Sequence, residues 1–144
     1  MLESLKAATF EVLETMFFLF PENPEDNAEP FHGSGVKAWV PVKGPKNFRI
    51  GLTVPLSLAR EMAANFLGLE KDDVASDNID DVLKETANMV AGTFLWKEQA
   101  PEGFHLGSPE VLHLDLDGLN RQKNANAILL VVDEAGLEVF LEKS

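Results

Sequence analysis

Residues 81–92, DVLKETANMVAG, predict the helix around which the rest of the fold is arranged. Three polar residues and a glycine, here called the polar line, recur at steps of four, three and four: Asp81, Glu85, Asn88 and Gly92. At about 100° per residue these positions fall within a sector of roughly 60°. The opposite side of this helix, expected over residues 78–97, carries Ile79, Leu83, Thr86, Val90 and Phe94. A helix buries such a stripe against a sheet, so the polar line should face away from the core.

The segments before this helix predict another helix, a hairpin and a further helix. Apolar residues at helical spacing indicate a first helix over residues 2–20, and the acidic, proline-rich stretch 21–30 ends it. The side of this helix expected in the core carries Leu2, Leu5, Val12, Leu13, Met16, Leu19 and Phe20. Residues 35–55 alternate like two strands about a turn at 44–45, and residues 55–69 read as a second helix.

The segments after it predict strands. Asp77 or Asn78 can cap the helix over 78–97. Residues 104–118 are strand-like, and residues 126–142 read as two strands joined by a turn at 134–136. This order predicts an α+β fold, with a mainly antiparallel sheet and helices packed on one face.

Length and composition restrict the class of protein. The chain has 144 residues, 45% of them hydrophobic, which suits one domain over residues 1–144 with a proper core. Its net charge of -12 repels phosphate backbones and anionic lipid, so neither nucleic acid nor a membrane surface is an expected partner. The absence of cysteine excludes disulfides, thiolate metal sites and cysteine nucleophiles.

The apolar run MFFLF at residues 16–20 is not expected to be a targeting or membrane segment. It follows three glutamates, lacks the basic segment of a signal peptide, and is far shorter than the roughly 20 residues that span a bilayer. We therefore expect a soluble, cytoplasmic protein.

The residue types of the polar line favour binding over simple solvation. Asparagine is a weak helix former, and glycine costs on the order of 1 kcal/mol relative to alanine inside a helix. Gly92 would let a partner approach closely, Asn88 could hold a water or an oxyanion, and Glu85 could pair with a cation. The alternative is the solvated polar face that any amphipathic helix has.

The polar line also resembles a known signature. Asp81, Glu85, Asn88 and Gly92, followed by Pro109, are similar to the Asp/Ser-x-x-x-Glu-x-x-Asn pattern of the CheC/CheX/FliY chemotaxis phosphatases. The order of elements along nearly the whole chain resembles the CheX-type members. The resemblance implies a CheC/CheX-like α/β sandwich formed by a single CheX-like domain.

The resemblance further implies an enzyme that dephosphorylates the aspartyl phosphate of a CheY-like response regulator. Asn88 would orient the attacking water and Glu85 would pair with the regulator's lysine. The chain would need no cofactor of its own, because the regulator holds the Mg²⁺. It would form a homodimer. The single-site CheX-like proteins match best, because Glu14 is followed three residues later by Phe17 where a second site would have asparagine.

Several residues are expected to contact the regulator around this site. Phe17 and Phe18 lie on the Glu14 side of the first helix, and aromatic residues are favoured at interfaces. The expected contact residues are Asp81, Gly92, Met89, Trp96, Phe17 and Phe18. The alternatives are that the first helix is covered on both sides and that Trp96 closes the end of the core.

No metal site is expected in the chain. Its histidines, His32, His105 and His113, are dispersed, and residues 115–120 lack the later ligands of a calcium loop and read as a turn. Two functions other than catalysis fit the same residues. One is a non-catalytic regulator-binding or dimerisation module, and the other is a structural subunit of a motility or signalling assembly.

Overall fold

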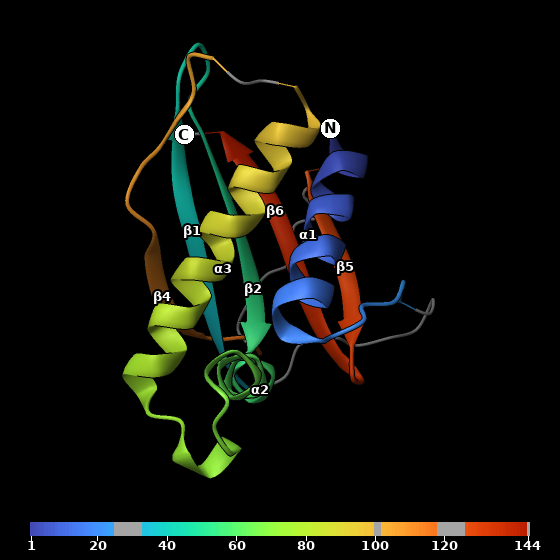
Figure 1. Ribbon diagram of the computed structural model, residues 1–144, viewed down its shortest axis with the longest axis vertical. Coiled ribbons are helices and arrows are strands. Elements are labelled where there is room, and N and C mark those ends of the chain that lie inside the picture. Colours follow the sequence, from blue (N-terminus) through green and yellow to red (C-terminus); the bar gives the residue numbers. More distant parts are fainter. Residues whose placement is uncertain (25–32, 100–101, 118–125, 144) are drawn as a thin grey trace.

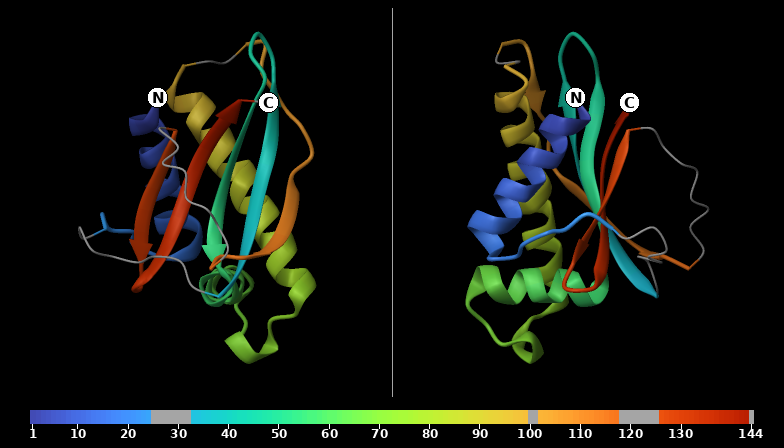
Figure 2. Two further views of the ribbon diagram at one scale, coloured as in Figure 1. Left: turned by 180° about the vertical axis from the view of Figure 1, so that it is seen from behind. Right: turned by 90° about the vertical axis from the view of Figure 1, so that its right-hand side faces the viewer.

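The computed structural model describes residues 1–24, 33–99, 102–117 and 126–143. The elements are α1 (Leu2–Phe17), β1 (Ser34–Lys43), β2 (Phe48–Pro55), α2 (Leu56–Leu67), the 3-10 helix η1 (Lys71–Asp73), α3 (Ser76–Lys97), β3 (His105–Leu106), β4 (Glu110–Asp115), β5 (Ala127–Val132) and β6 (Ala135–Lys143). The strands form a six-stranded sheet in the order β3-β1-β2-β6-β5, and β4 also pairs with β1. Every pairing is antiparallel. The three α-helices lie on one face of the sheet, as expected (Figures 1 and 2).

The predicted hairpin sets the register of the sheet. In β1, Val36, Ala38 and Val40 are fully buried and alternate with partly exposed residues on the other face. Ala38 pairs with Leu52 of β2, which in turn pairs with Val139 of β6. Because paired residues point to the same face of a sheet, these strands form one continuous apolar surface against which the helices pack.

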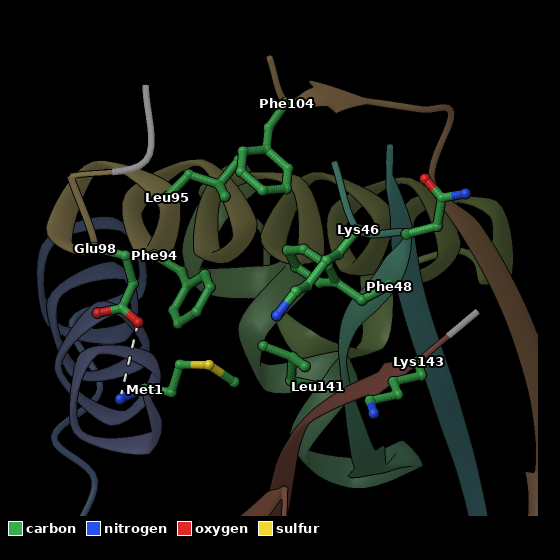
Figure 3. Close-up of a pocket in the computed structure, with 10 residues that line it drawn as sticks. Met1, Lys46, Phe48, Phe94, Leu95, Glu98, Phe104, Leu141 and Lys143 are labelled. Carbon is green, nitrogen blue, oxygen red and sulfur yellow. Dashed lines mark ion pairs between the residues drawn. The ribbon is translucent and has the colours of Figure 1, made fainter. Parts of the chain in front are cut away.

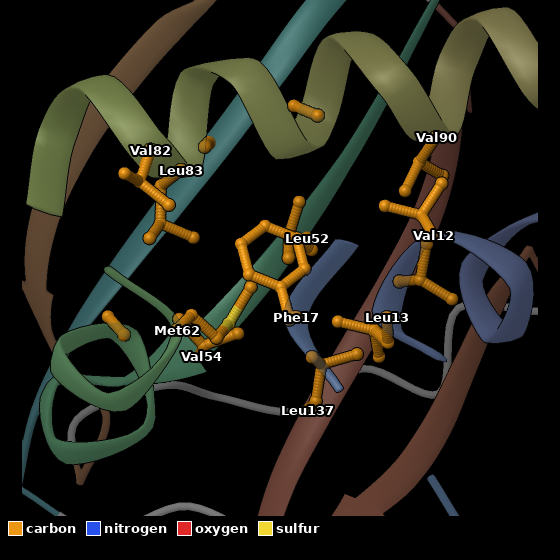
Figure 4. Close-up of a cluster of buried hydrophobic side chains, with 14 of the residues drawn as sticks. Val12, Leu13, Phe17, Leu52, Val54, Met62, Val82, Leu83, Val90 and Leu137 are labelled. Carbon is orange, nitrogen blue, oxygen red and sulfur yellow. The ribbon is translucent and has the colours of Figure 1, made fainter. Parts of the chain in front are cut away.

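The core fills the space between this apolar surface and the helices. Figure 4 shows side chains from α1, α2, α3 and the central strands meeting there, among them Phe17, Leu52, Met62, Leu83 and Leu137. Each of these five is almost completely buried. Among the described residues, no helix is long and apolar enough to cross a membrane.

The first helix is shorter than predicted, and this corrects several assignments. It ends at Phe17 because Phe18 adopts a left-handed conformation, with φ 56°. The Leu19 N–H then donates to the Leu13 carbonyl at 3.0 Å, which turns the chain back and buries Leu19. Phe20, expected in the core, is exposed as a result, and Met16, also expected there, is exposed within α1.

Phe17 is also not a surface residue. Its side chain is 0% exposed, and its ring lies 5.6 Å from that of Phe66 in α2. The Asn65 amide donates to the Phe17 carbonyl at 2.9 Å, which fixes the end of α1 against α2. The prediction that Phe17 contacts a partner was therefore wrong, and the alternative of a helix covered on both sides holds at this position.

Two boundaries later in the chain differ slightly from the prediction. Helix α3 begins at Ser76, two residues early, so its N-cap is Ala75 and not Asp77 or Asn78. Asn78 is the third helical residue, and its side chain accepts a hydrogen bond from the Ala75 N–H at 2.9 Å, which is the N3 contact of a capping box. The β5–β6 turn consists of Asp133 and Glu134, with φ 48° and 69°. Positive φ at both positions is the type I′ geometry that suits a two-residue hairpin, so residues 135–136 belong to β6 rather than to the turn.

Candidate functional site

Helix α3 presents the polar line outward, as the sequence predicted. All five residues of its predicted inner stripe, Ile79, Leu83, Thr86, Val90 and Phe94, are buried. Helix α3 packs against β1 and β2 and against the neighbouring helices α1 and α2. The buried Thr86 hydroxyl is satisfied by donating to the Val82 carbonyl at 2.7 Å.

The functional groups of the polar line are unengaged. Asp81 and Glu85 are exposed, and Asn88 is half-buried one turn beyond Glu85. Across residues 1–24, 33–99, 102–117 and 126–143, none of these three side chains has a hydrogen bond or ion pair. Two carboxylates and one amide are therefore free to bind groups from outside the chain.

Gly92 continues the line with an open position. A Cβ added there would meet no atom within 4 Å, apart from the helix's own neighbouring backbone. No internal contact in the described structure therefore requires glycine, although glycine in a helix costs about 1 kcal/mol relative to alanine. What the missing side chain offers is access to the helix backbone from outside, one turn beyond Asn88.

The apolar residues expected around the line take different positions. Trp96 is 82% exposed and so does not close the core, whereas Met89 is half-buried and packs against it. Phe18 is 71% exposed at the end of α1. Phe18 directly follows Phe17, whose carbonyl accepts from Asn65 of α2, so Phe18 lies at the end of α1 that meets α2.

One polar contact beside the line was missed by sequence reasoning. The His113 Nε2 of β4 lies 2.6 Å from the Asp80 carboxylate of α3. This contact ties the N-terminal half of α3 to the β4 edge of the sheet, directly before Asp81. His113 pairs with Val36, whose side chain faces the helices, so the parity of a correctly placed strand could have indicated it. Pro109, part of the family signature, is half-buried and directly precedes β4.

No metal centre is formed by the described part of the chain. No group of three or more His, Asp or Glu side chains there could hold an ion. His105 and His113 lie on different strands, and His32 is outside the described residues. Asp115 accepts the Asp117 N–H at 2.9 Å, so the start of 115–120 is the turn that was expected, while residues 118–120 are outside the described range.

Comparison with known proteins gives one family and several structures. The family Chemotaxis phosphatase CheX matches residues 36–133. The fold is similar to the chemotaxis protein CheX of Desulfovibrio desulfuricans, at 21% identity and TM-score 0.74, over 99% of this chain and 97% of that one. It is also similar to CheX of Vibrio vulnificus, at 21% identity and TM-score 0.72, over 97% and 95%.

A third similar structure is a complex. It contains CheX, CheY, BeF₃ and Mg²⁺ from Borrelia burgdorferi, and matches at 19% identity and TM-score 0.73, over 97% of this chain and 95% of that one. At these identities the likeness to solved structures establishes the fold. Among curated proteins no sequence matches this chain.

Proposed function

Because the chain belongs to the CheX family of chemotaxis phosphatases, we propose that it hydrolyses the aspartyl phosphate of a CheY-like response regulator, with α3 as the catalytic helix. The observation that carries this proposal is the outward, unengaged pair Glu85 and Asn88, with the open position at Gly92 one turn beyond.

In the proposed reaction Asn88 positions water. The amide oxygen accepts a hydrogen bond from the water while the amide N–H₂ donates to an oxygen of the phosphoryl group. The water oxygen forms a bond to phosphorus, the bond between phosphorus and the aspartyl oxygen breaks, and phosphate and the free aspartate are released. Such a reaction depends mainly on positioning and charge stabilisation, so an amide is a sufficient catalytic group.

Glu85 and Gly92 would serve the approach of the regulator. Glu85, one turn before Asn88, pairs with the regulator lysine that contacts the phosphoryl group, and this charged pair fixes the register of docking. Gly92 admits the regulator's backbone close to the helix. The Mg²⁺ belongs to the regulator, and this chain supplies no cofactor.

The docking surface would extend over both sides of the polar line. We assign Asp81, Met89, Trp96 and Phe18 to it, and exclude Phe17, which is buried. The CheX of Borrelia burgdorferi, which has a similar fold, forms a complex with CheY. A partner of this kind would place the protein in the cytoplasm.

A homodimer is also part of the proposal. The face of the sheet without helices carries the half-exposed Leu112 and the partly exposed Trp39, whose Nε1 donates to Glu110 at 3.1 Å. Exposed apolar residues on a sheet face favour association. Light scattering should give twice the chain mass for the wild type and the chain mass for Leu112→Glu; a monomeric wild type would exclude the dimer.

The test of catalysis is the decay of phosphoryl label on a CheY-like regulator. Wild-type protein should accelerate decay, and Asn88→Ala should reduce the acceleration about 10²- to 10³-fold, the usual cost of one transition-state donor. Its thermal stability should stay the same or rise slightly, because the amide makes no contact in the described structure and alanine is the better helix former. Asn23→Ala, the same change at an exposed site outside α3 where the amide oxygen accepts a hydrogen bond from Lys6 Nζ, should leave the decay as in wild type.

The same assay separates the enzyme from its alternative. A regulator that binds the chain yet decays at its own rate would identify a non-catalytic binding module. Glu85→Ala should weaken regulator binding about tenfold. A double-mutant cycle with the regulator lysine should show coupling, and additive effects would reject this pairing.

A further inference from the structure

A cavity at the C-terminal end of α3 has no role in the proposed phosphatase reaction. It has a volume of about 560 Å³ and lies between the last turns of α3, the turn that joins β1 to β2, and the end of β6 (Figure 3). Its size is within the range of small-molecule sites, which is about 300–1,000 Å³.

The wall of this cavity is apolar. Phe94 and Leu95 of α3 form one side, and Phe48 of β2 and Leu141 of β6 form the other. Phe104 covers it from the segment before β3, with its ring centroid 5.9 Å from that of Phe48 in an edge-on arrangement. Phe48, Leu95 and Phe104 are only partly buried, so their exposed surface would gain from contact with an apolar ligand.

The rim of the cavity is positively charged. Lys46 and Lys143 stand on it, both exposed, and neither forms an ion pair with any described residue. Figure 3 shows the Lys46 ammonium group directed across the cavity toward Leu141 and Phe94. The single acid of the lining, Glu98, is already engaged, since it accepts from the Ser4 hydroxyl at 2.8 Å and lies 3.8 Å from the Met1 amine.

The positive charge of this rim is opposite in sign to the net charge of the chain. The net charge is -12, yet the two free charges at this rim are cations. An apolar wall with two unpaired ammonium groups is complementary to a ligand that has an apolar body and one anionic group. A neutral apolar ligand would leave both ammonium groups unused.

We propose that this cavity binds a small amphipathic anion, a carboxylate on an alkyl chain, with its apolar body against Phe48, Phe94 and Leu141 and its carboxylate between Lys46 and Lys143. The inference does not depend on the phosphatase reaction, because neither Glu85 nor Asn88 lines the cavity.

The test uses decanoate as the probe, below the concentration at which it forms micelles, with binding followed by backbone amide NMR. We expect saturable binding with one site per chain, and the largest shifts at Phe48, Leu95 and Leu141. Decanol has the same chain without the charge and should bind about fivefold more weakly, as expected for two exposed ion pairs. Decylammonium should bind more weakly still.

Two variants locate the site. Replacing Lys46 and Lys143 together by glutamine should reduce decanoate affinity to that of decanol and leave decanol affinity unchanged. Lys71→Gln in η1 removes the same kind of exposed charge at a distance from the cavity and should have no effect. Leu95→Trp should fill the cavity and abolish binding of both probes.

Three results would overturn the proposal. They are equal affinity for decanoate and decanol, unchanged decanoate affinity in the double variant, and shifts that spread over the whole chain without saturation. Each can be read from binding alone, whatever the chain does to a phosphorylated regulator.

Discussion

At Gly92 in α3, one substitution should change stability and the proposed activity in opposite directions. Gly92 lies inside the helix, and a Cβ there meets nothing within 4 Å. Replacing it by alanine should therefore stabilise the protein by the full difference in helix propensity, about 1 kcal/mol. With an unfolding entropy of about 2.1 cal/mol/K per residue, this corresponds to a rise in Tm of about 3 °C.

The same substitution should impair the proposed activity. A methyl group on the outer surface of α3 would keep the regulator's backbone from its docked position, and displacement by about 1 Å can cost 10²-fold in rate. We therefore expect Gly92→Ala to lower the acceleration of phosphoryl decay between about 10- and 100-fold. Gly92→Gln should gain about half as much stability and lose more activity, because its side chain is longer.

Urea unfolding and the labelled-regulator decay measure the two effects on the same samples. Ala7→Gly is a matched control: it makes the reverse change at an exposed position of α1, and should lose about 1 kcal/mol with no loss of activity. If Gly92→Ala destabilised the protein, an internal reason for glycine would exist and the argument would fail. Full activity in Gly92→Gln would show that the regulator does not approach α3 at this position.

Two further predictions concern stability. In urea unfolding, Phe17→Ala should lower the free energy of unfolding by about 3–5 kcal/mol because it empties a fully buried site. Phe18→Gly should be neutral or stabilising, because glycine favours the left-handed φ of 56° at this position. Equal losses in the two variants would contradict the burial of Phe17 and the exposure of Phe18. Burial, followed by a hydrogen bond to Asp133 and the charge of that residue, raises the pKa of Glu61 above its ordinary 4.5. The folded state then binds this proton more readily than the unfolded state, so the contribution of Glu61 to stability falls as pH rises above 4.5. The difference in free energy of unfolding between Glu61→Gln and wild type should therefore shift in favour of the variant as the pH rises from 4 to 7. A difference that does not grow with pH would refute the raised pKa of Glu61.

The sequence determined the elements whose patterns are local. The spacing of Ile79, Leu83 and Val90 was enough to orient α3, because side chains three and four residues apart share one face of any helix. It therefore also determined that Glu85 and Asn88 face outward. Alternation in residues 35–55 likewise predicted the β1–β2 hairpin, since its turn joins neighbouring segments.

Only the tertiary structure decided where patterns end and which distant segments meet. Phe17 and Phe18 are equally apolar, and their periodicity continues to Phe20, yet one is in the core and the other on the surface. That difference depends on contacts with Phe66 and Asn65, about 50 residues later in the chain. The contact between Asp80 and His113, and the cavity between α3, β2 and β6, have the same origin. Periodicity records only which side of an element is buried, whereas a contact between elements depends on how the whole chain packs.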